Sequence, residues 1–110
     1  MKKPAMVAPS PQVVRRYALR RLAEVFGVSE ESLSPDTRLG LELKASPASD
    51  FKTNQFDIVD DDIRDVADKR LLKEMAQGKL VIQTVGDYCE HMVRCSIVNP
   101  EEVVRVLRLP

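Results

Sequence analysis

The most concentrated group of ionisable side chains is a run of aspartates between residues 50 and 68. Seven Asp face only two basic residues there, Lys52 and Arg64, which leaves a local charge of −5. Asp61, Asp62 and Asp65 form the pattern Asp-Asp-x-x-Asp, whose carboxylates suit a hard cation such as the Mg²⁺ of a metal-diphosphate site. Such a site also needs a second acidic motif and a large helical cavity, and a chain of 110 residues is too short to enclose that cavity.

A solvated acidic face that docks a basic partner is therefore the favoured interpretation of this segment. The residues expected on that face are Asp57, Asp60, Asp61, Asp62, Asp65 and Asp68. A small metal-dependent hydrolase built on the same cluster is an alternative.

The second candidate group is Cys89, His91 and Cys95. The two cysteines are six residues apart, which places them on roughly opposite flanks of a helix. Zinc prefers four ligands, and the chain has a single His. Cys89 and His91 are two positions apart and point in different directions, which disfavours a Cys–His catalytic pair. We expect two reduced, half-buried thiols in a cytoplasmic protein, and a surface position for His91.

The rest of the chain carries no other catalytic signature. Its four glycines are not clustered into a phosphate-binding loop, and it has no serine-nucleophile motif, so we expect a protein that is not an enzyme. Seventeen Lys and Arg balance seventeen Asp and Glu, and a net charge of zero argues against a non-specific nucleic-acid binder. No apolar run approaches the roughly 20 residues of a membrane span, and the N-terminus lacks the apolar stretch of a signal peptide.

Length and composition predict one folded domain. The chain has 110 residues, of which 44% are hydrophobic and 31% are charged. Only 5% are aromatic, so the core must be aliphatic. We expect a flexible tail over residues 1–11, a helical domain over 12–97 and a C-terminal helical extension over 98–110, in a monomeric protein.

A first amphipathic helix is predicted after the tail, with Ser10 as its N-cap, Pro11 in its first turn and Gly27 as its C-terminal stop. Apolar residues recur at spacings of three and four from Val14 to Phe26. The other face is basic and carries Arg15, Arg16, Arg20 and Arg21. We expect this basic face to be solvated, or paired with the acidic helix of this chain or of another molecule.

Further helices follow a long loop over residues 34–49. The apolar spacing predicts helix over residues 50–77. The β-branched stretch 79–83 is expected to be an extended connector, because the chain offers no partner strand. Thr84 then caps another helix, and a short helix begins at Pro100. The sum is an all-α fold, a small bundle of three to four helices with a long first loop plus a short C-terminal helix.

Two stretches resemble the acyl carrier protein family. Residues 19–43 are similar to the family's first helix, its Gly-Val turn and the loop that follows. Residues 82–88, Ile-Gln-Thr-Val-Gly-Asp-Tyr, are similar to the Thr-Val-Gly-Asp start of the family's last helix. The resemblance covers roughly residues 12–95. It implies a carrier-like bundle, active in lipid or polyketide metabolism, whose acidic second helix docks on basic surfaces of acyl-transferring or acyl-activating enzymes.

The attachment motif is the main departure from this family. Carrier proteins have Asp-Ser-Leu at the start of the second helix, and a 4′-phosphopantetheine arm esterified to that serine holds an acyl group as a thioester. Residues 42–51 contain no Asp-Ser-Leu here. Ser49 is the first candidate for modification by a phosphopantetheinyl transferase, and Ser46 is the second. The alternative is a carrier-like fold without a prosthetic group that serves as a protein–protein interaction module.

The spacing between Ser49 and Val85 is a second departure, because it exceeds the family's usual spacing by several residues. Either the second helix is extended, or the family's short third helix is replaced by residues 69–83. Both changes would reshape the pocket in which the family shelters its acyl chain.

Overall fold

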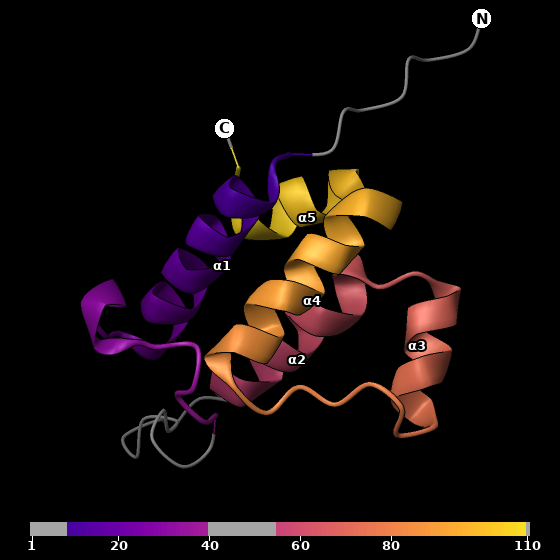
Figure 1. Ribbon diagram of the computed structural model, residues 1–110, viewed down its shortest axis with the longest axis horizontal. Coiled ribbons are helices and arrows are strands. Elements are labelled where there is room, and N and C mark those ends of the chain that lie inside the picture. Colours follow the sequence, from indigo (N-terminus) through magenta and orange to yellow (C-terminus); the bar gives the residue numbers. More distant parts are fainter. Residues whose placement is uncertain (1–8, 40–54, 110) are drawn as a thin grey trace, which may run out of the picture.

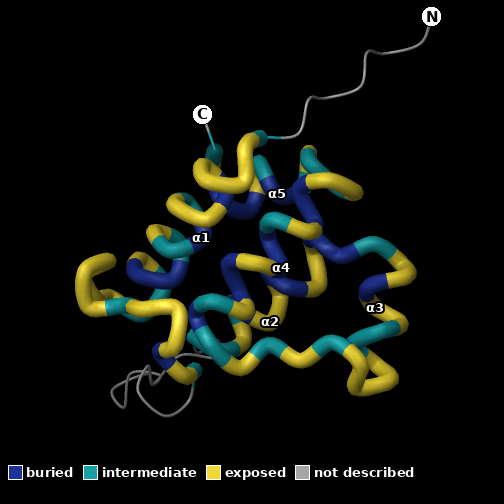
Figure 2. Tube along the Cα trace, viewed as in Figure 1, coloured by how far each residue is buried: buried dark blue, intermediate teal, exposed yellow. Residues whose placement is uncertain are grey.

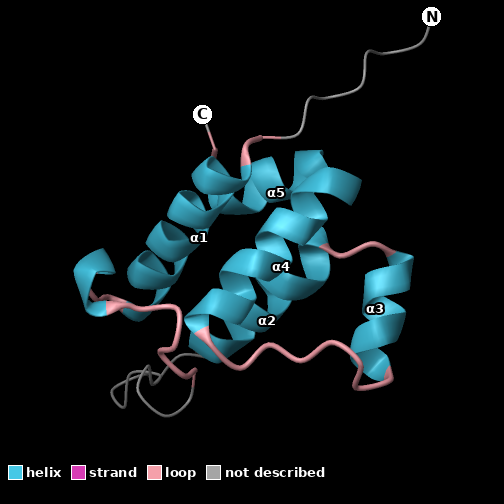
Figure 3. Ribbon diagram, in the orientation of Figure 1, coloured by secondary structure: helices cyan, strands magenta, loops and turns pink. Residues whose placement is uncertain are grey.

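The computed structural model describes residues 9–39 and 55–109, and the regular elements within these ranges are helices (Figures 1 and 3). In chain order they are α1 (Pro11–Phe26), a 3₁₀ turn (Glu30–Ser32), α2 (Gln55–Val66), α3 (Lys69–Ala76), α4 (Val85–Val98) and α5 (Pro100–Leu107). Strand-like pairing in the described ranges is one isolated antiparallel bridge between Arg38 and Thr84. The prediction of a small all-α bundle is confirmed.

Four helices form the bundle, and α4 lies centrally among them (Figure 1). α1 and α2 flank α4, and α5 packs against all three. α3 stands to one side of this group and contributes a single buried residue, Leu71. The bundle therefore leaves one face of α2 and one face of α1 open to solvent.

The helix ends follow the local signals in the sequence. The Ser10 side chain accepts a hydrogen bond from the Val13 N–H at 3.3 Å, and Pro11 occupies the first turn of α1. Gly27 ends α1 in the left-handed conformation with φ 68°, which glycine adopts without steric cost. At the start of α4, Thr84 and Asp87 form a reciprocal capping box. These three predicted boundaries are confirmed.

The helical stretch expected over residues 50–77 is divided within its described part, which begins at Gln55, whereas residues 50–54 lie outside the described residues. α2 ends at Val66, and α3 begins at Lys69. Asp68 adopts an extended backbone, and its carboxylate accepts a hydrogen bond from the Leu71 N–H at 2.9 Å, which starts a new helix. The carboxylate thus competes successfully with the helical hydrogen bonds that would have continued α2 through this position.

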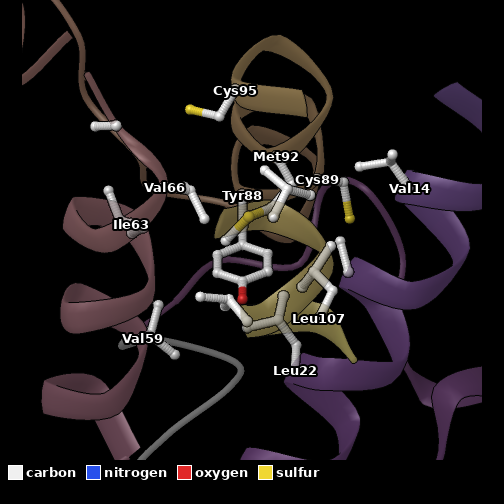
Figure 4. Close-up of a cluster of buried hydrophobic side chains, with 14 of the residues drawn as sticks. Val14, Leu22, Val59, Ile63, Val66, Tyr88, Cys89, Met92, Cys95 and Leu107 are labelled. Carbon is white, nitrogen blue, oxygen red and sulfur yellow. The ribbon is translucent and has the colours of Figure 1, made fainter. Parts of the chain in front are cut away.

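The core is mainly aliphatic, as the composition predicts, and its other buried members include Tyr88, Met92 and the two cysteines. Tyr88 and Met92 of α4 are fully buried between Leu22 of α1 and Val66 of α2 (Figure 4). From α5, the buried side chains are Val103, Val106 and Leu107. The C-terminal extension therefore belongs to the same hydrophobic core as the preceding helices, and the exposed residues lie on the outer helix faces and on the connectors (Figure 2).

Candidate functional site

The aspartates of α2 divide into an exposed and a buried group. Four are exposed on the outer surface of the helix, and we call them the acidic face: Asp57, Asp60, Asp61 and Asp65. Most of them recur at intervals of three or four residues, so they share one side of α2. The exposure of these four residues is as expected, and their docking role stays a prediction.

Asp62 was expected on the same face, and that expectation is wrong. Its residue is only 5% exposed, because it lies on the inner face of α2 with Val59, Ile63 and Val66. The Asp62 carboxylate accepts two hydrogen bonds from Arg21, from Nε at 2.9 Å and from a terminal nitrogen at 3.2 Å. It also accepts one from the Tyr88 hydroxyl at 3.0 Å. Asp62 therefore links α1, α2 and α4.

The charge of Asp62 is balanced by these neighbours. Its hydrogen bonds raise the pKa of the Arg21 guanidinium. Burial raises the pKa of the Tyr88 hydroxyl well above its usual value, and the adjacent Asp62 charge raises it further. Tyr88 thus stays protonated and donates its hydroxyl hydrogen bond to the Asp62 carboxylate. The Arg21–Asp62 pair confirms one expectation for the basic face of α1, namely that it pairs with the acidic helix of the same chain.

Asp68 also departs from the predicted docking role, since its carboxylate caps α3 and is half-buried. The Asp-Asp-x-x-Asp pattern is separated as well: Asp61 and Asp65 face solvent, whereas Asp62 faces inward. Within residues 9–39 and 55–109, no three His, Cys, Asp or Glu side chains are grouped so that they could hold a metal ion.

Two cations lie beside the acidic face. Arg64 approaches Asp60 at 3.3 Å, and Arg105 of α5 approaches Asp65 at 3.7 Å. Both pairs are exposed, and Arg105 is shared with Glu102 at 2.7 Å. Exposed ion pairs of this kind contribute little energy and are readily exchanged. On the same face, Asp61 makes no ion pair with another described residue.

An apolar groove of about 330 Å³ borders the acidic face near the N-terminal half of α2. Its walls are Phe56, Val59 and Ile63 of α2, together with Leu39 and Ile82 from the two flanking connectors, and Asp60 lies at its edge. The Leu39 N–H donates to the Gln83 carbonyl at 2.8 Å, which holds the two connectors together. Acidic and apolar surface are therefore adjacent on one side of the molecule.

The Thr-Val-Gly-Asp stretch anchors the first connector to the start of α4. The Val85 N–H donates to the Thr37 carbonyl and the Gly86 N–H to the Pro35 carbonyl, each at 2.9 Å. A Cβ atom at Gly86 would meet the Pro35 oxygen at 2.9 Å, so only glycine permits this approach. The motif that carried the family resemblance thus has a physical task, which is to hold residues 35–39 near the N-terminus of α4.

A larger groove, of about 590 Å³, lies on the other side of this anchored connector. Leu19 of α1, Leu33 and the Val85 and Cys89 side chains of α4 form its apolar surface. The ion pair between Arg15 and Glu90, at 2.6 Å, crosses one end. The sequence offered no signal for this groove, because its walls bring residues 15–36 together with residues 84–90.

His91 and both cysteines are buried, which corrects the expectation of a surface histidine and half-buried thiols. The imidazole Nε2 donates to the Ile63 carbonyl at 2.9 Å and lies 3.5 Å from the Cys95 sulfur. Burial lowers the pKa of His91 and raises the pKa of Cys89 to about 11 and that of Cys95 to about 12. These groups are neutral near pH 7, so the arrangement lacks the thiolate of an activated nucleophile.

The histidine contact joins His91 to Cys95 rather than to Cys89. The i, i+4 spacing of His91 and Cys95 on one helix was the available signal. The two candidate attachment residues, Ser46 and Ser49, lie outside the described residues.

Comparison of the chain with protein-family models, with curated protein sequences and with solved structures returns no match. Among the helices of residues 9–39 and 55–109, none combines the length and apolar character that crossing a membrane requires.

Proposed function

We propose that this protein is an atypical acyl carrier that docks on basic surfaces of partner enzymes through the acidic face of α2. The observation that carries the proposal is the adjacency of that face to the apolar groove formed by Leu39, Phe56, Val59, Ile63 and Ile82. A carrier needs recognition and shelter for its cargo but no catalytic residue of its own. The acidic face suits recognition, and the adjacent apolar groove suits shelter of the cargo.

The acidic face supports transient docking through its charge. Complementary charges accelerate encounter and orient the two proteins, while solvent-exposed contacts allow rapid release. Asp61 is available without breaking an ion pair among the described residues, and the pairs of Asp60 and Asp65 are weak and exposed. A basic partner can therefore engage this face without unfolding any part of α2.

The groove supports the transport of an apolar group. Its five side chains offer an acyl chain an apolar surface, and each methylene buried against them stabilises such a complex by about 0.8 kcal/mol. The same groove touches Asp60 of the acidic face, so a partner docked there would meet the mouth of the groove.

Ser49 is the proposed attachment residue for 4′-phosphopantetheine, with Ser46 as the second choice. Ser49 precedes Gln55, the first residue of α2, by six positions. The proposed attachment residue is therefore close in sequence to the helix that carries the acidic face.

Intact-mass spectrometry tests the proposal. The protein is incubated with coenzyme A and a phosphopantetheinyl transferase, alongside the variants Ser49→Ala, Ser46→Ala and their combination. We expect a mass gain of one phosphopantetheine that is lost in Ser49→Ala or in the double variant. Ser29→Ala is the matched control, because Ser29 is exposed and its side chain makes no capping hydrogen bond. No gain, or a gain that survives the double variant, would refute carriage on these serines.

The second candidate function is a carrier-like interaction module without a prosthetic group, and the absence of Asp-Ser-Leu favours it. This module would bind its partner with or without coenzyme A. Pull-down from the native source at low and high salt tests it, using Asp57→Asn with Asp61→Asn to weaken the acidic face. Retention of a partner that ignores both salt and these substitutions would contradict docking through α2.

A further inference from the structure

A small pocket between α1 and α5 brings three arginines together. It measures about 130 Å³ and is lined by Arg20 and Arg21 of α1, by Arg108 at the end of α5, and by Tyr17 and Glu24. This volume is a few times the share of one water molecule, so the pocket suits a compact ion rather than an extended ligand. These arginines belong to α1 and to the end of α5, and their charge is opposite to that of the acidic face of α2.

Arg108 occupies this position in an unusual backbone conformation. Its φ of 55° and ψ of 48° are left-handed, and Arg108 is the sole non-glycine residue with positive φ in the described ranges. The conformation closes α5, with the Leu109 N–H donating to the Val104 carbonyl at 3.0 Å. Glycine is the usual residue at such a position because side chains disfavour it. The Arg108 guanidinium makes no ion pair with any described residue.

The other two arginines can still donate hydrogen bonds to an ion in the pocket. Arg20 pairs with Glu24 at 3.2 Å, but both side chains are about half exposed, so the guanidinium can exchange this partner at little cost. Its packing over the Tyr17 ring, 5.9 Å from the centroid, keeps it at the pocket. Arg21 uses two of its five N–H groups on Asp62, which leaves three.

The charges at this pocket favour an anion. Three guanidinium groups meet two carboxylates, Glu24 and Asp62, which leaves a net charge of +1. Guanidinium groups bind phosphate oxygens through paired, charge-assisted hydrogen bonds. A phosphate offers oxygens in several directions, so it can reach arginines that come from two helices, whereas a planar carboxylate offers only two oxygens.

We propose that the pocket formed by Arg20, Arg21 and Arg108 binds a phosphate group, either as inorganic phosphate or as a compact phosphate monoester. This site is separate from the acidic face, because none of the exposed aspartates of α2 lines it.

Phosphate titration monitored by NMR tests the proposal on the full chain. Ionic strength is held constant with sodium chloride, and inorganic phosphate and phenyl phosphate are added in separate series. We expect saturable shifts of the amide signals of residues 20, 21 and 108. Tighter binding of phenyl phosphate would identify monoesters as the ligands, and tighter binding of inorganic phosphate would identify the free ion.

Three variants make the test decisive. Arg20→Gln and Arg108→Gly should each weaken binding by about tenfold, the loss of one charge-assisted contact. Arg70→Gln is the control, because it removes the same charge from α3, away from the pocket, and should leave binding unchanged. Glycine adopts the backbone of residue 108 more easily than arginine, so Arg108→Gly should raise thermal stability while it loses phosphate.

Two outcomes would overturn the proposal of a phosphate site. The first is a set of shifts that chloride alone reproduces at equal ionic strength. The second is equal weakening in Arg70→Gln, Arg20→Gln and Arg108→Gly, since that result would assign the effect to net charge rather than to the pocket.

Discussion

Asp62 of α2 and Arg21 of α1 form a two-point ion pair, at 2.9 and 3.2 Å, across the interior of the bundle. The Asp62 side chain is 7% exposed and the Arg21 side chain 21%. The pair is satisfied further by the Tyr88 hydroxyl, so three helices depend on one carboxylate. The consequence is that neighbouring aspartates on α2 have opposite roles, one structural and the others available to partners.

Asp62→Asn should destabilise the protein by about 2–3 kcal/mol, because it leaves Arg21 without its counter-charge in a largely buried site. Asp61→Asn is the matched control: it makes the same chemical change one residue away on the exposed surface and should change stability by less than about 0.5 kcal/mol. Urea unfolding monitored by circular dichroism measures both. Equal midpoints for the two variants would show that the Asp62 contacts contribute nothing.

Acidification should destabilise the fold through His91. Burial is the main cause that lowers the pKa of His91 below 6.5, its unfolded value, and nearby Arg94 adds to it, whereas the hydrogen bond to Ile63 opposes it. The unfolded chain therefore takes up a proton first as the pH falls, and stability present above pH 6.5 is lost below it. Between pH 7.5 and 5.5 the loss from this group should approach, but not exceed, about 1.4 kcal/mol.

Urea unfolding at these two pH values measures that loss, and His91→Gln provides the comparison. The variant should have a flatter pH profile even where its stability at pH 7.5 is lower. A wild-type profile that is flat over this range, or one that the variant reproduces, would contradict a titrating role for His91. Glu90, whose pKa is lowered by its hydrogen bonds to Arg15, titrates below this range.

Both thiols should resist modification in the folded protein. The pKa of Cys89 is raised to about 11 from 9.0, which alone lowers its thiolate fraction at pH 8 by about 100-fold. Cys95 is more deeply buried and has a pKa of about 12, so it should react more slowly still. Labelling with a disulfide reagent, with and without urea, tests this order, and Cys89→Ser isolates the signal of Cys95. Rapid labelling of either thiol without urea would contradict the burial of that residue.

Gly86→Ala should destabilise the protein by about 1–3 kcal/mol, because the new Cβ would lie 2.9 Å from the Pro35 oxygen. Helix propensity alone predicts the opposite sign, a gain of about 1 kcal/mol for alanine over glycine within α4. Thermal unfolding gives the sign, and hydrogen exchange locates the effect at the amides of Val85, Gly86 and Leu39. A stabilised variant would show that the connector does not depend on this close approach.

Local chemistry was sufficient to predict three of the helix ends, the two ends of α1 and the start of α4. Ser10, Gly27 and Thr84 act through hydrogen bonds and backbone angles within a few residues, so their roles can be inferred from neighbours in sequence. The division at Asp68 is also local, but the apolar spacing continued through it and obscured the carboxylate cap. Periodicity reports which face is buried, whereas it does not report whether one helix or two carry that face.

The candidate site was predictable only in part. The acidic character of α2 is a property of composition, and four exposed aspartates follow from it. The burial of Asp62 required a cation, Arg21, which lies forty-one residues earlier on α1. No pattern within α2 indicates such a partner. The burial of His91 also depends on a distant partner. Its ring N–H donates to the carbonyl of Ile63, which lies twenty-eight residues earlier in the chain.

The helical class, the caps and the segregation of acidic from basic residues were thus contained in the order of amino acids, because each depends on side chains close together along the chain. The roles of Asp62, Gly86, Arg108 and the groove beside α2 arose only when distant segments packed against one another. Burial changes the cost of a charge, and contact across the bundle supplies its partner, so the same residue type is a docking group at position 61 and a structural link at position 62.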